Sequence, residues 1–157
     1  MPIDLEPLTY EATEYICLHL RDRDAQEIYG LRWTDSPLAL AQDTYSIIAQ
    51  HGVGWVALWD GRPVATLGIV EKWPRVWQVF SYGTDDWRRS VLTLSRHGKT
   101  VIKDYLLSRD AHRLECETHC EHIDAHRWLE MMGAEKEGIR SGYGKDGSDY
   151  ITYVWRQ

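Results

Sequence analysis

Residues 114–134, LECETHCEHIDAHRWLEMMGA, decide the fold. The first five alternate apolar and acidic or polar side chains, which is typical of a strand. Apolar side chains then recur at helical spacing and form one stripe: Ala125, Trp128, Leu129 and Met132. Gly133 follows, and glycine adopts the left-handed conformation of a helix end without steric cost. We therefore expect a strand, a helix over 122–132, and a second strand from Ala134 onward.

The rest of the chain extends this pattern in both directions. Strands are predicted over 3–8, 55–59, 64–70, 76–82, 114–118, 134–141 and 148–155. Helix starts are predicted at Thr9, Ser36 and Ser95, a short helical stretch over 25–29, and a polar irregular loop over 83–94. This order predicts one α/β domain over 1–157, a mixed and mostly antiparallel sheet of about six to seven strands flanked by about four helices.

Composition limits the classes of function. The 157 residues suit a single domain, and 43% hydrophobic with 27% charged residues is typical of a globular chain. A net charge of -6 disfavours nucleic-acid binding, and no apolar run is long enough for a membrane span. The first residues lack the features of a signal peptide, and three cysteines are an odd number, so we expect a reducing cytoplasmic compartment.

The element order and lengths resemble the GNAT superfamily of acetyl-CoA-dependent N-acetyltransferases. In that family a strand is followed by a helix with the motif Asn-x-x-Ala-x-x-x-Tyr-x-x-x-Gly-Phe. The matching positions here are His122, Ala125, Leu129, Gly133 and Ala134. The alanine and the glycine agree, whereas the asparagine, tyrosine and phenylalanine are replaced. The resemblance implies a GNAT-like acyl-CoA N-acyltransferase fold over nearly the whole chain.

A narrower resemblance covers residues 77–155. This part is similar to the small internal virion proteins of short-tailed (podovirus) phages, which are degenerate members of the same superfamily. It is carried by Leu94-Ser95 before a basic helix, by the His126-Arg-Trp-Leu-x-x-x-Gly-Ala helix end and by the Gly144-Lys-Asp-Gly hairpin. It implies a bacteriophage protein in the host cytoplasm or the virion, with other virion proteins, a host protein or a second copy of the chain as partner.

The resemblance also implies where acetyl-CoA would bind. The family holds the pyrophosphate on backbone amides of a glycine-rich turn that opens a helix, where the helix dipole favours an anion. Residues 83–100 correspond to that turn, but they contain no Arg-x-x-Gly-x-Gly sequence. The cofactor candidates are Phe80, Tyr82, Arg96, His97, Gly98, Lys99, Thr100 and His122. The alternative is that 95–100 is simply a basic, solvated helix start.

The sequence argues against two other types of site. Gly98-Lys99-Thr100 imitates the end of a P-loop, but Thr93 stands where that motif needs a glycine, which excludes a nucleotide hydrolase. Five potential metal ligands lie within eleven residues: Cys116, His119, Cys120, His122 and His126. They straddle a strand and a helix and would point in different directions, so no metal is expected.

Acetyl transfer to an amine needs a base for the amine and often an acid for the departing thiolate. The family's acid is the motif tyrosine, whose place is taken by Leu129, and leucine has no proton to donate. Tyr82, Tyr143 or Cys120 could replace the acid, and Glu117, His119 or His122 could act as base. The catalytic candidates are Glu117, His119 and Tyr143.

Three hypotheses remain open: a virion-associated or assembly protein with a degenerate acetyl-CoA site, an active acetyl-CoA-dependent N-acetyltransferase, and an acyl-CoA sensor without turnover. The segment 83–100 separates the first two. An enzyme should have a cleft there with converging amides, opened by divergence of the two middle strands. An assembly protein should have that cleft filled by side chains such as Trp87 or Leu92.

Overall fold

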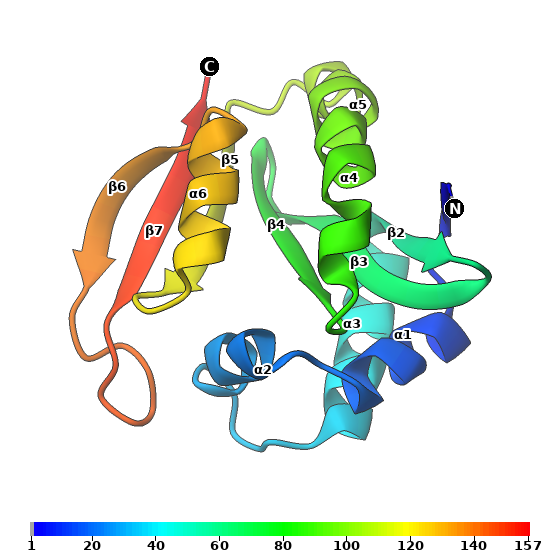
Figure 1. Ribbon diagram of the computed structural model, residues 1–157. Helices are drawn as coiled ribbons and strands as arrows, with labels where there is room; N and C mark the ends of the chain where they lie inside the picture. Colours follow the sequence, from blue (N-terminus) through cyan, green and yellow to red (C-terminus); the bar gives the residue numbers. More distant parts are fainter. Residues whose placement is uncertain (1) are drawn as a thin grey trace.

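Seven strands form one sheet in the order β1-β2-β3-β4-β5-β7-β6 in the computed structural model, which describes residues 2–157 (Figure 1). The strands are β1 (Ile3–Pro7), β2 (Gly52–Trp59), β3 (Arg62–Trp73), β4 (Val76–Gly83), β5 (Arg113–His119), β6 (Glu135–Arg140) and β7 (Tyr150–Arg156). The helices are α1 (Tyr10–Leu18), α2 (Asp22–Tyr29), α3 (Pro37–His51), η1 (Trp87–Ser90), α4 (Val91–His97), η2 (Gly98–Ile102), α5 (Lys103–Ser108) and α6 (Ile123–Met131). Only β4 and β5 pair in parallel, which confirms the predicted mixed, mostly antiparallel α/β fold.

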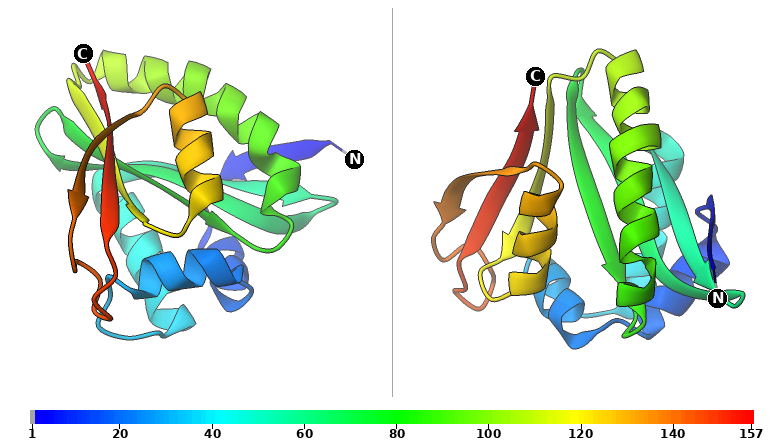
Figure 2. Two further views of the ribbon diagram at one scale, coloured as in Figure 1. Left: turned by 60° about the vertical axis from the view of Figure 1, so that its left-hand side comes forward. Right: turned by 45° about the horizontal axis from the view of Figure 1, so that its top comes forward.

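Helices cover both faces of the sheet. One face carries a continuous helical rod of α4, η2 and α5, with α6 beside it, and the other carries α1 and α3 (Figure 2). Under the rod, Leu94 and Ile102 pack in one core with Leu67 of β3. On the opposite face, Ile16 and Leu40 pack in a second core with residues of β2 and β4. Each such side chain contributes about 1.5–3 kcal/mol when fully buried, so both layers are held to the sheet by apolar packing.

The elements with local sequence signals form as predicted. The Thr9 hydroxyl accepts the amide N–H of Ala12 and caps α1, and the Ser36 hydroxyl caps α3 in the same way. Asp60 and Gly61 both have positive φ in the two-residue turn between β2 and β3, as that hairpin turn requires. Gly133, with φ +92°, ends α6.

The predicted loop over 83–94 and the predicted helix cap at Ser95 are wrong. Residues 87–90 already form a helical turn, and α4 begins at Val91. The Ser95 side chain is buried, donates to the carbonyl of Val91 and accepts the indole N–H of Trp128. Because Trp87 and Leu94 face the core at helical spacing, their burial extends the helix through a stretch that is otherwise strongly charged.

Candidate functional site

The sheet opens in its middle, where β4 and β5 diverge. The two strands pair only at Val76–Arg113, Trp77–Leu114 and Gln78–Glu115. Beyond these positions they separate, and they end at Gly83 and His119. Because the strands are parallel, both carboxyl ends lie at the wide end of the opening.

A cavity of about 240 Å³ fills this divergence, and we call it the central pocket. Side chains from both strands, α2 and α6 line it. The lining includes Arg21, Glu27, Phe80, Tyr82, Trp87, Cys116, Glu117, His122, Trp128, Leu129 and Tyr143. Its place between the strand ends makes it the candidate functional site.

Five of the predicted site residues meet at the central pocket: Phe80, Tyr82, Glu117, His122 and Tyr143. Burial raises the pKa of Tyr82, whose hydroxyl donates to Thr44 at 2.8 Å. The Glu117 carboxylate already pairs with Arg140 at 2.9 Å and accepts the Thr152 hydroxyl. Two of these groups are therefore committed to partners inside the protein.

His119 does not line the central pocket. It is buried, its Nδ1 accepts the amide N–H of Glu121, and its ring lies edge-on to Tyr150. The geometry gives it a packing role at the end of β5, and its assignment as a base stays a prediction.

The candidates from Arg96 to Thr100 lie in the middle of the helical rod rather than at a helix start. The Gly98 amide donates to carbonyls of the preceding turn, and the Gly98 carbonyl accepts the Lys103 amide. His97 packs edge-on against Trp55, and burial lowers its pKa. The physical basis for an anion site on these amides, a free helix N-terminus, is therefore absent at residues 96–100.

The contribution of α2 to the site was not predicted from the sequence. Asp24 is buried, and its carboxylate accepts the Gly83 amide at 2.8 Å and two N–H groups of Arg21 at 2.9 Å. Glu27 accepts the His119 amide at 3.0 Å and contacts His122 Nδ1 at 2.8 Å. A charged run such as 21–24 usually marks a solvated surface, so nothing local indicated these contacts.

His122 joins the two halves of this network. Its Nε2 lies 3.3 Å from Arg21 Nη2. A guanidinium can only donate, so when Nε2 accepts from Arg21 it is Nδ1 that carries the proton toward Glu27; Nε2 also lies 3.5 Å from Asp24 Oδ1. The lone pair that a catalytic base would need is therefore already engaged with Arg21.

Aromatic side chains close the helix-bearing face of the central pocket. The rings of Trp87 and Trp128 meet edge to face with centroids 5.2 Å apart, and the Arg21 guanidinium lies 4.6 Å from the Trp87 ring centre. Trp87 is 6% exposed and lines the central pocket, whereas Leu92 is 73% exposed and does not, so of these two only Trp87 narrows the opening.

The turn between β4 and α4 has few amides to offer an anion. The amides of Trp87 and Arg89 donate to Thr84 and Asp86, and the Val91 amide donates to Arg88. The cations of this turn are paired as well, Arg88 with Asp124 at 2.9 Å and Arg89 with Asp86 at 3.1 Å.

The cysteines and histidines of 116–126 do not converge. Over residues 2–157, no three His, Cys, Asp or Glu side chains are arranged to hold a metal ion. Burial raises the pKa of both Cys17, to about 11, and Cys116. In the same part of the chain, no helix has the length and apolar character needed to cross a membrane.

The comparisons place this geometry among known folds. No protein-family model matches the chain, and the search of curated proteins finds no match. Solved structures do match. An N-acetyltransferase from Staphylococcus aureus Mu50 has a TM-score of 0.77 at 11% identity, covering 99% of both chains. The Escherichia coli ribosomal-protein-S18-alanine N-acetyltransferase has a TM-score of 0.71 at 17% identity, covering 99% of this chain and 94% of the other.

The fold is that of the GNAT N-acetyltransferases. A further similar structure, AAC(6')-Ib in complex with ribostamycin and coenzyme A, has a TM-score of 0.68 at 17% identity and covers 100% of this chain and 94% of the other. At such identities the likeness establishes a shared fold, and the function has to be argued from the site.

Proposed function

We propose that this chain is a non-catalytic acetyltransferase-fold protein with a degenerate acetyl-CoA site, which acts in the virion or the assembly of a tailed phage. One observation supports the proposal that the acetyl-CoA site is degenerate. The Trp87–Trp128 pair and the Arg21–Asp24 ion pair cross the wide end of the strand divergence. A thioester cofactor would have to pass there to reach the centre of the sheet.

The electrostatics of the β4–α4 turn support this proposal. A pyrophosphate needs free N–H groups or unpaired cations, whereas the amides of Trp87, Arg89 and Val91 and the guanidinium groups of Arg88 and Arg89 already have partners inside the protein. To bind the cofactor here, the protein would have to break the ion pairs of Arg88 and Arg89 and rearrange a turn that contains the buried Trp87.

The chemistry of the central pocket supports it as well. Leu129 lines the pocket at the position of the family's proton-donating tyrosine. His122 Nε2 is occupied by Arg21, and Glu117 is occupied by Arg140. Neither an acid nor a base among these residues is free to act.

The proposed phage role rests on the resemblance of 77–155 to internal virion proteins. Its proposed partners are other virion proteins, a host protein or a second copy of the chain. Exposed aromatic side chains suit such contacts, since Trp33 is fully exposed and Trp73 is 58% exposed.

Titration calorimetry with acetyl-CoA tests the loss of the site. We expect no detectable heat at millimolar ligand, with circular dichroism as the control for folding. Micromolar binding, about 8 kcal/mol, would contradict the proposal. The virion role is tested separately by mass spectrometry of gradient-purified particles and procapsids of the phage that encodes the chain. Absence from both would refute that role.

A second candidate is an active N-acetyltransferase, and one observation favours it. Glu27 lines the central pocket, and both hydrogen bonds of its carboxylate within residues 2–157 fall on Oε2. Its Oε1 could therefore accept a proton from an amine. Transfer of labelled acetyl groups from acetyl-CoA to an amine, abolished by Glu27→Gln but retained in Glu121→Gln, would establish this candidate instead.

A further inference from the structure

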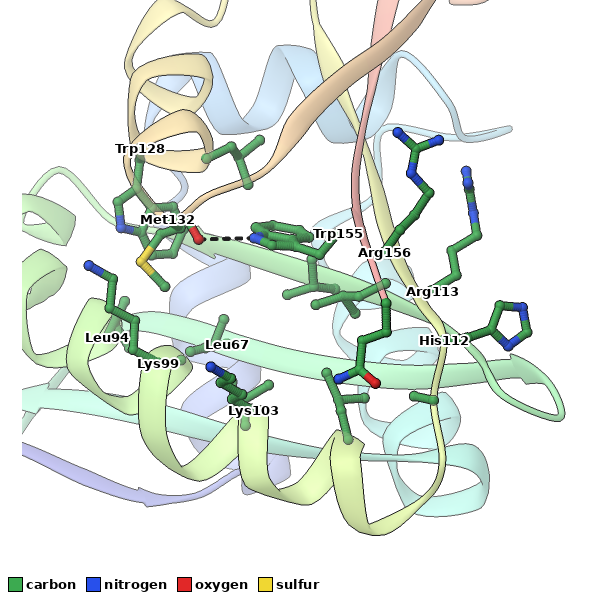
Figure 3. Close-up of a pocket in the computed structure, with 18 residues that line it drawn as sticks. Leu67, Leu94, Lys99, Lys103, His112, Arg113, Trp128, Met132, Trp155 and Arg156 are labelled. Atoms are coloured by element: carbon green, nitrogen blue, oxygen red, sulfur yellow. Dashed lines mark hydrogen bonds between the residues drawn. The ribbon is translucent and has the colours of Figure 1, made fainter.

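A second and larger cavity, of about 470 Å³, lies on the face of the sheet that bears the helical rod. We call it the rod cavity. It occupies the space between the rod and α6, over the start of β5 (Figure 3). Trp128 and Leu129 contribute to its wall and to that of the central pocket, so the two cavities lie on either side of these residues.

The interior of the rod cavity is apolar. Its walls include Leu67, Leu94, Ile102, Leu114, Met132 and Trp155. The rod contributes lining residues from Leu94 to Leu106, a length of about 18 Å at the rise of a helix. A cavity this long and apolar suits an extended hydrocarbon chain better than a compact polar ligand.

The residues that line the rod cavity are basic, although the chain as a whole has a negative net charge. Acidic residues outnumber basic ones by 24 to 18 in the sequence, yet the lining contains no Asp or Glu. It contains five basic residues: Lys99, Lys103, His112, Arg113 and Arg156. Figure 3 shows Lys99 and Lys103 on the rod, and the other three on the side of β5 and β7.

Among the described residues, the two lysines of this set have no carboxylate partner. Arg113 pairs with Glu115 and Glu137, and Arg156 pairs with Glu135. Within residues 2–157, neither Lys99 nor Lys103 takes part in any ion pair. An anion at the cavity mouth could therefore pair with these two ammonium groups without displacing a carboxylate.

The rod is locally distorted beside these lysines. The Lys103 amide donates to the carbonyl of Gly98, five residues earlier, which makes this a π-helical turn. A Cβ on Gly98 would lie 2.8 Å from the Met132 methyl group, so the end of α6 lies close against the rod at this point. π-helical turns occur often at functional sites, and this one carries both lysines onto the cavity lining.

We propose that the rod cavity binds a straight-chain fatty acid, with its tail between the rod and α6 and its carboxylate at Lys99 and Lys103. Apart from the five basic residues, Gln157 is the one polar side chain in the lining, too few uncharged polar groups to hold a sugar or a nucleotide base. The basic rim would repel a cationic amphiphile, and a neutral alkane chain would leave the lysines without a counter-charge.

Calorimetry with octanoate, decanoate and dodecanoate, each below its critical micelle concentration, tests whether the hydrocarbon tail binds in the apolar cavity. Each added methylene should tighten binding by up to about fourfold until the cavity is filled. Decanol and decyltrimethylammonium should both bind more weakly than decanoate. Binding that ignores tail length, or decanol binding as tightly as decanoate, would overturn the proposal.

Charge reversal tests the head-group site. Lys99→Glu/Lys103→Glu should weaken decanoate binding about tenfold, since each surface ion pair contributes up to about 1 kcal/mol. Arg127→Glu/Lys136→Glu is the matched control, because it makes the same change in net charge at two exposed residues that do not line the cavity. Equal affinities of the two variants would refute the site, as would binding of an acidic amphipathic peptide with no binding of decanoate. Urea unfolding of both variants confirms that they are folded.

Discussion

Removing the Asp24 carboxylate should destabilise the protein severely. Asp24 is 2% exposed and accepts three hydrogen bonds, two from Arg21 and one from the Gly83 amide. Asp24→Ala would leave a guanidinium whose side chain is only 15% exposed, together with a buried N–H, without partners. Breaking a buried pair in this way costs about 3–5 kcal/mol, which for a chain of this length lowers Tm by about 6–20 °C.

Urea unfolding followed by tryptophan fluorescence measures this loss, with an unchanged m value as the sign that folding remains two-state. Glu121→Ala is the matched control. It removes the partner of Arg23 in a pair whose side chains are 56% and 61% exposed, so it should cost less than about 1 kcal/mol. If Asp24→Ala cost no more than Glu121→Ala, the ion pair would not hold the strand ends together. The double variant Arg21→Met/Asp24→Leu should recover much of the lost free energy of unfolding, because it leaves no buried charge without a partner.

Three further predictions follow from burial and helix geometry. Cys120 is the least buried cysteine, so a thiol reagent should modify one thiol in the folded protein and three in urea, and Cys120→Ser should abolish the fast reaction. Burial lowers the pKa of His97 and His126, so below about pH 6.5 the unfolded chain binds more protons than the folded protein. The free energy of unfolding should therefore fall as the pH drops below that value. Urea titrations of His97→Gln and His126→Gln should show a smaller decrease of the free energy of unfolding over the same pH range. Gly98→Ala should raise the free energy of unfolding by about 0.5–1 kcal/mol, measured as a higher Tm, because only the flexible end of Met132 stands in the way; a lower Tm would show that Met132 cannot move.

Local signals predicted much of the fold. Caps at Thr9 and Ser36, the Asp60-Gly61 turn and the stop at Gly133 act within a few residues of themselves, so the sequence alone places them. The start of α4 was misplaced because charged residues over 85–89 suggested a loop. The buried positions Trp87 and Leu94, at helical spacing, carried the correct signal.

The candidate site was only partly predictable, because its main contacts join distant segments. Glu27 and His122 are 95 residues apart, and Arg21 and His122 are 101 apart. No spacing rule connects such residues. The motif helix could indicate that His122 lies near the centre of the sheet, but it could not indicate that a carboxylate from α2 would meet it.

The diverging strands explain why α2 turns one buried and one half-buried carboxylate, Asp24 and Glu27, toward the sheet. Where β4 and β5 separate, their backbone N–H groups lose the ladder partner that a sheet normally supplies, and a buried N–H without a partner is costly. Asp24 accepts the N–H of Gly83 at the end of β4, and Glu27, one helical turn later, accepts the N–H of His119 at the end of β5. The Arg21 amide in turn donates to the Gly83 carbonyl. A bound cofactor with amide groups of its own could hydrogen-bond to the same backbone N–H groups at the strand ends. Here the first turns of α2 satisfy them, so the sheet can be stable with an open middle and no ligand in the opening.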